Sequence, residues 1–73
     1  MSVELEYSRL IRLIKERLIT LKITQSELAR KVGISPPAIS QIINKIKYPT
    51  VLTLLNILQA LELIVSYEIR ENP

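Results

Sequence analysis

Hydrophobic residues recur with helical spacing along the first part of the chain. The run from Glu4 to Leu21 contains neither Gly nor Pro, and basic side chains occupy its other faces. Its apolar positions are Tyr7, Leu10, Ile11, Ile14, Leu18 and Leu21. Because side chains three and four residues apart share one face of a helix, this pattern predicts an amphipathic helix over residues 4–21.

A second, shorter helix is predicted between Thr24 and Gly33. Thr24 precedes Glu27 by three residues, the spacing of a capping box, in which each side chain bonds the other residue's backbone amide. Gly33 stands where a helix often ends, because Gly adopts the left-handed conformation without a steric penalty. The apolar face of this helix is short: Leu28, Ala29 and Val32.

Two adjacent prolines, Pro36 and Pro37, interrupt a segment whose apolar spacing is otherwise helical. Ser35 is a favourable N-cap, and Pro36 then falls at the first helical position, where its missing amide would have no partner. Because Pro37 has no amide either, the Ser35 hydroxyl is expected to accept from the amide of Ala38. The prolines therefore predict the start of a helix that runs to about Asn44. The alternative is an extended proline-rich ligand segment.

A fourth helix is predicted from Val51 to Leu61, with Pro49 closing the preceding loop and Thr50 as its cap. Apart from a narrow polar stripe, this helix is apolar on all sides. A small domain cannot cover so wide an apolar face, so we expect part of it to contact a second molecule.

The spacing changes after the fourth helix. From Leu63 to Arg70 two sets of side chains alternate, with β-branched and aromatic residues among them, which is typical of a strand. No other segment offers this strand a partner, and an unpaired strand leaves a row of amides and carbonyls without bonds. We therefore expect it to pair with its copy in a second chain; the alternative is a frayed extension of the helix.

Length and composition narrow the possible functions. The chain has 73 residues, enough for one small domain, and it contains no Cys, no His and one Gly. Disulfides, thiol or imidazole catalysis, zinc sites and glycine-rich phosphate loops are thereby excluded, and no carboxylates cluster with metal-ligand spacing. We expect neither an enzyme nor a cofactor or metal site. No apolar run approaches the roughly 20 residues of a membrane span, and no signal peptide is evident, which indicates a cytoplasmic protein.

Charge is distributed unevenly along the chain. Residues 7–50 contain nine of the ten Lys and Arg residues and two acidic residues, a net charge of +7, whereas the two ends together carry −4. A basic central region indicates an anionic partner, with nucleic acid the leading candidate. The alternative is a solvated basic surface without a partner.

Two short helices joined by a turn that contains Gly form a helix-turn-helix motif, here residues 25–44. A small residue, Ala29, stands where the helices would cross, and Gly33 stands in the turn. The predicted fold is mainly α: a four-helix domain over residues 1–62, followed by a dimerisation strand and tail over residues 63–73.

These residues resemble the XRE/Cro-type helix-turn-helix family of DNA-binding domains, over roughly residues 11–63. The resemblance implies a lambda-repressor-like fold and a transcriptional regulator. The segment "LTLLNILQALELIVSYEI" resembles HipB-type antitoxins, which implies a dimeric autorepressor that binds a palindromic operator and a HipA-like kinase toxin. The family usually has Glu-Asn-Gly where this chain has Ile43, Asn44 and Lys45, so we expect Asn44 to adopt the left-handed conformation.

In this docking geometry the second helix of the motif enters the major groove of double-stranded DNA. The residues expected to face base edges are Ser35, Pro36, Pro37, Ala38, Ser40 and Gln41. The residues expected to contact phosphates are Lys22, Gln25, Ser26, Asn44, Lys45, Lys47 and Tyr48. The residues expected in the homodimer interface are Leu52, Ile57, Leu63, Ile64, Val65, Tyr67 and Ile69.

Two other functions fit the same sequence. One is a stand-alone phage-type XRE regulator without a toxin partner. The other is an adaptor that uses the same helices to bind a protein, which predicts little salt-sensitive affinity for DNA.

Overall fold

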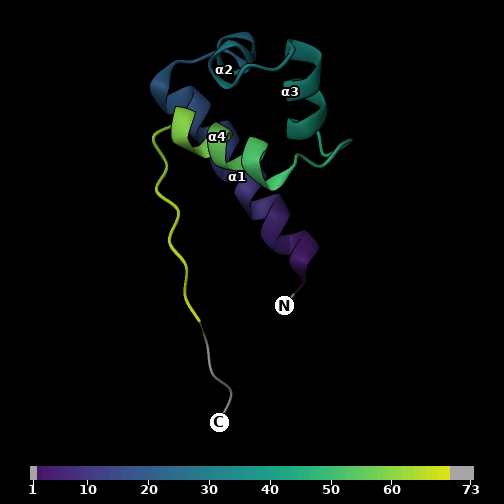
Figure 1. Cartoon of the computed structure of the whole chain (residues 1–73), viewed down its shortest axis with the longest axis vertical. Helices are drawn as coiled ribbons and strands as arrows, with labels where there is room; N and C mark the ends of the chain where they lie inside the picture. Colours follow the sequence, from purple (N-terminus) through teal and green to yellow (C-terminus); the bar gives the residue numbers. More distant parts are fainter. Residues whose placement is uncertain (1, 70–73) are drawn as a thin grey trace.

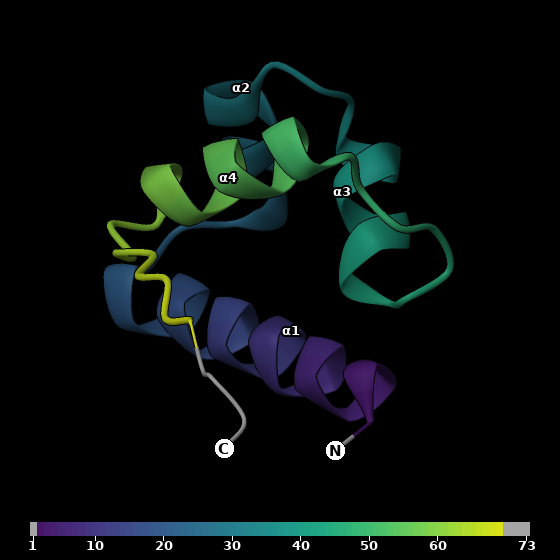
Figure 2. The same ribbon diagram turned by 60° about the horizontal axis from the view of Figure 1, so that its bottom comes forward.

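A computed structural model describes residues 2–69, and it contains the four predicted helices (Figure 1). Their bounds are α1 Val3–Leu21, α2 Gln25–Val32, α3 Pro36–Ile43 and α4 Val51–Ala60. α2 packs against both α3 and α4, and α3 also meets α1. Figure 2 shows α4 lying between α1 and α2, with α3 at the end of the molecule where α1 begins.

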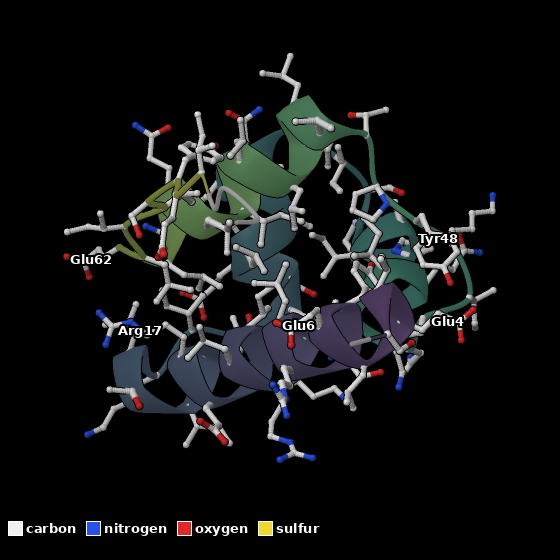
Figure 3. The ribbon with its side chains drawn as sticks, turned by 90° about the horizontal axis from the view of Figure 1, so that it is seen from below. Glu4, Glu6, Arg17, Tyr48 and Glu62 are labelled. Atoms are coloured by element: carbon white, nitrogen blue, oxygen red, sulfur yellow. The ribbon has the colours of Figure 1, made fainter. Side chains whose placement is uncertain are left out.

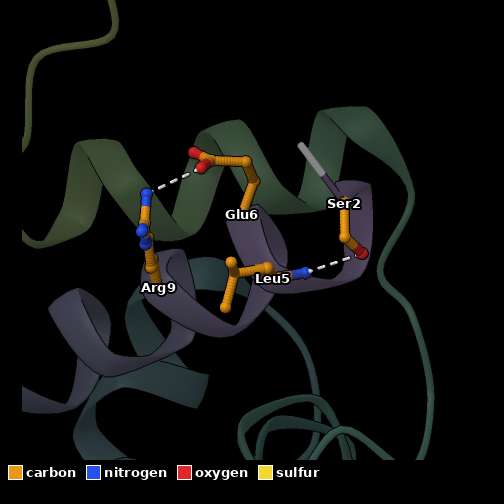
Figure 4. A network of polar contacts seen from close by, with 4 residues as sticks. All are labelled: Ser2, Leu5, Glu6 and Arg9. Atoms are coloured by element: carbon orange, nitrogen blue, oxygen red, sulfur yellow. Dashed lines mark hydrogen bonds and ion pairs between the residues drawn. The ribbon is translucent and has the colours of Figure 1, made fainter.

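α1 begins one residue earlier than its apolar pattern predicts, because Ser2 caps it. The Ser2 hydroxyl accepts a hydrogen bond from the Leu5 amide at 3.4 Å (Figure 4). Glu4 and Glu6 lie in the first turn, where negative charge is favoured by the helix dipole. The Arg9 guanidinium also pairs with the Glu6 carboxylate at 2.9 Å.

The three caps predicted for the shorter helices are confirmed. In the capping box, the Thr24 hydroxyl accepts from the Glu27 amide at 3.1 Å, and the Glu27 carboxylate accepts from the Thr24 amide at 3.3 Å. The Ser35 hydroxyl accepts from the Ala38 amide at 3.3 Å, so the prolines do occupy the first turn of α3. Thr50 caps α4 in the same way.

Left-handed residues follow all four helices. Gly33 does so with φ of 83°, as predicted, whereas Lys22, Lys45 and Glu62 adopt φ between 55° and 60° although each carries a Cβ. The prediction for Asn44 is wrong, since its φ is −87° and Lys45 takes the left-handed conformation instead. Lys45 is the residue that replaces the family's Gly, so the turn keeps its geometry at the cost of strain in a non-Gly residue.

One apolar core joins the four helices. Its buried side chains are Ile11, Ile14, Leu18, Leu28, Ala29, Ile39, Ile42, Ile43, Ile57, Leu58 and Leu61. Ile57 is only 1% exposed, so its predicted role in a dimer contact is wrong: it packs inside its own chain. Arg17 fastens α1 to the end of α4 by donating from Nε to the Leu61 carbonyl at 2.9 Å; Figure 3 shows it at the opposite end of α1 from Tyr48.

The predicted C-terminal strand is absent from the described part of the chain. Residues 63–69 leave α4 as an extended segment that forms no β-bridge (Figure 1). A strand requires a neighbouring ladder, and the other described segments are helices and short connections that offer none. The prediction for residues 70–73 lies outside the described residues. Among residues 2–69, no helix combines the length and hydropathy needed to span a bilayer.

Candidate nucleic-acid interface

The crossing of α2 and α3 fixes which side of α3 faces outward. Ala29 is fully buried at this crossing, and its carbonyl accepts from the amides of Gly33 and Ile34 at 2.8 and 3.0 Å. Leu28 and Ile39 fill the space between the helices with no exposed surface. Because the apolar side of α3 is anchored in this way, its other side is left facing solvent.

The residues predicted to face base edges divide into two groups. Ser35, Pro36 and Pro37 at the start of α3 are exposed, whereas Ala38, Ser40 and Gln41 are half-buried. The Ser40 hydroxyl already accepts from the side-chain amide of Asn44 at 3.2 Å. Gln41 lines a shallow depression together with Ala38, Lys47 and Tyr48. The exposed start of α3 therefore carries no charge.

The two helix N-termini of the motif differ in what they offer an anion. In α3 the first two positions are prolines, and the Ala38 amide is used by Ser35, so none of these three positions has a free amide. In α2 the side chains of Gln25 and Ser26 are exposed. Their backbone amides come before that of Glu27, which is the amide that the Thr24 hydroxyl caps. α2 is therefore the helix whose N-terminus suits a phosphate.

Lys22 and Gln25 share a second depression at the junction of α1 and α2. Lys15 from α1 lines the same depression, with apolar residues forming its floor. Two ammonium groups thus gather beside the start of α2, where the helix dipole also favours negative charge.

The loop between α3 and α4 contributes the remaining basic groups. The Gln41 carbonyl accepts from the amides of Ile46 and Lys47 at 2.8 and 3.2 Å, which folds the loop back on α3. Lys45, Lys47 and Tyr48 are exposed at its surface. Within residues 2–69 neither lysine pairs with a carboxylate, so both charges are available to an anion.

Two residues beside this loop were not predicted as part of the site. Tyr7 of α1 stacks edge-on against Tyr48, with ring centroids 5.1 Å apart and planes inclined at 61°. The neighbouring Ser8 hydroxyl lies 3.3 Å from the Lys45 ammonium. The apolar spacing of α1 marked Tyr7 as inward-facing, but no local pattern relates Ser8 to a residue 37 positions away.

The Tyr7 hydroxyl oxygen is buried and has no hydrogen-bond partner among residues 2–69. Burial, and to a smaller extent the neighbouring Tyr48, raises the pKa of Tyr7 above its ordinary value of 10. The phenol is therefore neutral at physiological pH, and the ring acts here as a packing surface.

An exposed helix packed on a second helix of equal length, with basic groups on both flanks, defines a helix-turn-helix DNA-binding domain. A model of the XRE-type helix-turn-helix family, HTH_3, matches residues 14–64, and the chain belongs to this family. The family consists of DNA-binding regulators rather than enzymes as a rule. No curated protein and no solved structure matches the chain. The predicted resemblance to the XRE type is thus confirmed, while the narrower one to HipB-type antitoxins stays a prediction.

Proposed function

We propose that this protein is a sequence-specific transcriptional regulator that binds a palindromic operator as a homodimer, with α3 in the major groove. The observation that carries the proposal is the exposed, uncharged end of α3 between two groups of basic side chains. Uncharged side chains suit base edges, whereas flanking ammonium groups suit the phosphates on either side of a groove.

Direct readout in this proposal depends mainly on Gln41. A Gln side chain forms two hydrogen bonds with adenine, and the exposed Pro37 and the adjacent Ala38 suit contact with a thymine methyl group. Ser35 and Ser40 bond several bases with little discrimination. We therefore expect an A·T pair opposite Gln41 and a contribution from DNA shape elsewhere in the site.

Phosphate binding is assigned to two clamps. One consists of Lys22, Gln25 and Ser26 at the start of α2. The other is the loop after α3, with Asn44, Lys45, Lys47 and Tyr48. Charge neutralisation at both releases counterions, so affinity should fall steeply as salt rises.

The homodimer is proposed from the exposed apolar surface beside the C-terminal segment. α1, α4 and this segment line an apolar groove of about 490 Å³. Along the segment Ile64, Tyr67 and Ile69 are almost fully exposed, and Leu52 on α4 is 70% exposed. Pairing residues 63–69 with their copy would cover these side chains and supply the missing ladder. It would also fix the distance of about 34 Å that two recognition helices need to reach successive major grooves.

The antitoxin role rests on the resemblance to HipB-type proteins alone, and with it the HipA-like kinase toxin as a partner. The cytoplasmic location is proposed separately, as the place where a regulator of this family meets DNA. A stand-alone regulator shares every feature of the DNA-binding proposal. The two differ in whether a kinase-like gene lies beside this one.

Binding to duplex DNA at several salt concentrations tests the DNA-binding proposal, with operator sequences first selected from a random pool. Gln41→Ala should weaken binding to the selected site by about 1–3 kcal/mol and relax the preference at one base pair. Lys47→Ala should weaken binding to every sequence and lower the salt slope by about one.

Lys31→Ala is the matched control for the loss of charge. Lys31 lines a depression with Asn56 and Gln59 of α4, and none of these residues is assigned a contact with DNA. Its removal should therefore leave the salt slope nearly unchanged. Equal losses by the Gln41 variant on selected and random DNA would contradict its role. Weak, salt-insensitive DNA binding by the unaltered protein would favour the adaptor function instead.

A further inference from the structure

The loop that carries Lys45, Lys47 and Tyr48 is attached to the rest of the protein on two sides. On one side its backbone bonds to the Gln41 carbonyl at the end of α3. On the other side its side chains reach the first two turns of α1. These turns lie before residue 14, where the match to the family begins.

Both contacts with α1 come from adjacent residues. The Tyr7 ring meets the Tyr48 ring edge-on at 5.1 Å, and the Ser8 hydroxyl meets the Lys45 ammonium at 3.3 Å. Tyr7 is partly buried against the core, whereas Tyr48 is 72% exposed. The core therefore fixes the Tyr7 ring, and the Tyr7 ring in turn supports Tyr48.

The chemistry of these contacts leaves the loop's charge free. A hydroxyl orients the Lys45 ammonium without neutralising it, and an edge-on ring pair immobilises Tyr48 without using its hydroxyl. Neither acidic residue of the same turns, Glu4 or Glu6, forms an ion pair with Lys45, and Glu6 pairs with Arg9 instead.

We propose that Tyr7 and Ser8 are positioning residues that hold the loop after α3 in its phosphate-binding conformation before DNA arrives. This inference rests on the proposed DNA-binding function and adds a role for the start of α1. A loop ordered in advance loses less conformational entropy on binding, so Tyr7 and Ser8 contribute to affinity although neither is assigned a contact with DNA.

Tyr7→Ala is the decisive variant, compared with the unaltered protein on selected and random duplexes. It should lower affinity on both about two- to tenfold, the usual range for an aromatic pair. The salt slope should stay unchanged, because no cation is removed. Tyr7→Phe keeps the ring and removes only the unpartnered hydroxyl, so it should bind like the unaltered protein.

A second comparison separates this role from a loss of stability. In a Tyr48→Ala background, Tyr7→Ala should cause no further loss of DNA affinity, since the ring that it holds is gone. Amide hydrogen exchange of residues 45–48 in the free protein should be faster in Tyr7→Ala and unchanged in Tyr7→Phe.

Three results would overturn the inference: full affinity of Tyr7→Ala, a loss of the same size in the Tyr48→Ala background, or a loss that Tyr7→Phe shares. Failure of the DNA-binding proposal is recognised separately, because the unaltered protein would then lack salt-dependent affinity for any duplex.

Discussion

At some positions of this protein the backbone conformation, rather than side-chain chemistry, limits which residue fits well. Gly33 adopts φ of 83° with open space where a Cβ would lie, so the demand at this position is conformational and not steric. Lys22 meets the same demand at φ 55° with a full side chain, as the C-cap of α1. Both conformations follow from the need to end one helix and start another within a few residues.

The two positions predict opposite effects of exchanging Gly and a larger residue. Gly33→Ala should lower the free energy of unfolding by about 1 kcal/mol, because Ala is strained at this φ. Lys22→Gly should raise it by about 0.5 kcal/mol, since release of the strain outweighs the added flexibility of the unfolded chain. Urea denaturation without DNA measures both. A stabilised Gly33→Ala variant would refute the geometric argument.

At the scale of elements, short helices depend on their ends. α2 and α3 contain eight residues each, too few to be stable alone in water, so capping and tertiary packing must stabilise them. In α3 the prolines fix the entry of the chain and leave the Ala38 amide as the first of the helix, and Ser35 satisfies it. The start of α3 was therefore predictable from the four consecutive residues 35–38.

Ser35→Ala should therefore destabilise the free protein by about 1 kcal/mol. Ser26→Ala is the matched control: Ser26 is exposed at the second position of α2, where Thr24 is the cap, and its loss should change stability by less than about 0.5 kcal/mol. Thermal or urea unfolding compares the two variants. Equal losses would show that the cap of α3 contributes nothing specific.

At the scale of the whole molecule, the core is complete within one chain while an apolar surface stays outside it. α4 illustrates the division: Ile57 and Leu58 are buried, whereas Val51 and Leu52 at its start are largely exposed. The exposed part continues into the groove beside residues 63–69. Exposed apolar surface of this extent is typical of an interaction site.

If that site is the homodimer interface, Ile64→Lys should shift the protein from dimer to monomer. Ile64 is 96% exposed, so the change should leave the fold of the single chain intact. Val3→Lys is the control, because Val3 is similarly exposed but lies in the first turn of α1, outside the groove. Sedimentation measures association, and affinity for a full palindrome should fall more than affinity for a half-site. A monomeric unaltered protein would contradict the proposal.

The sequence by itself determined the four helices, the N-caps of the last three and the order of the motif, because these depend on interactions between residues at most four positions apart. Thr24 with Glu27, and Ser35 with the two prolines, are signals of this kind.

Only the tertiary structure decided which apolar residues are buried in the core, which residue after α3 is left-handed, and which side chains of α1 contact the loop after α3. Ile57 and Leu52 look alike in the sequence, yet the packing of α4 buries the first and exposes the second. Tyr7 and Tyr48 meet only because α3 turns back toward the start of α1. Contacts across so many residues depend on the path of the whole chain, and no local pattern encodes them.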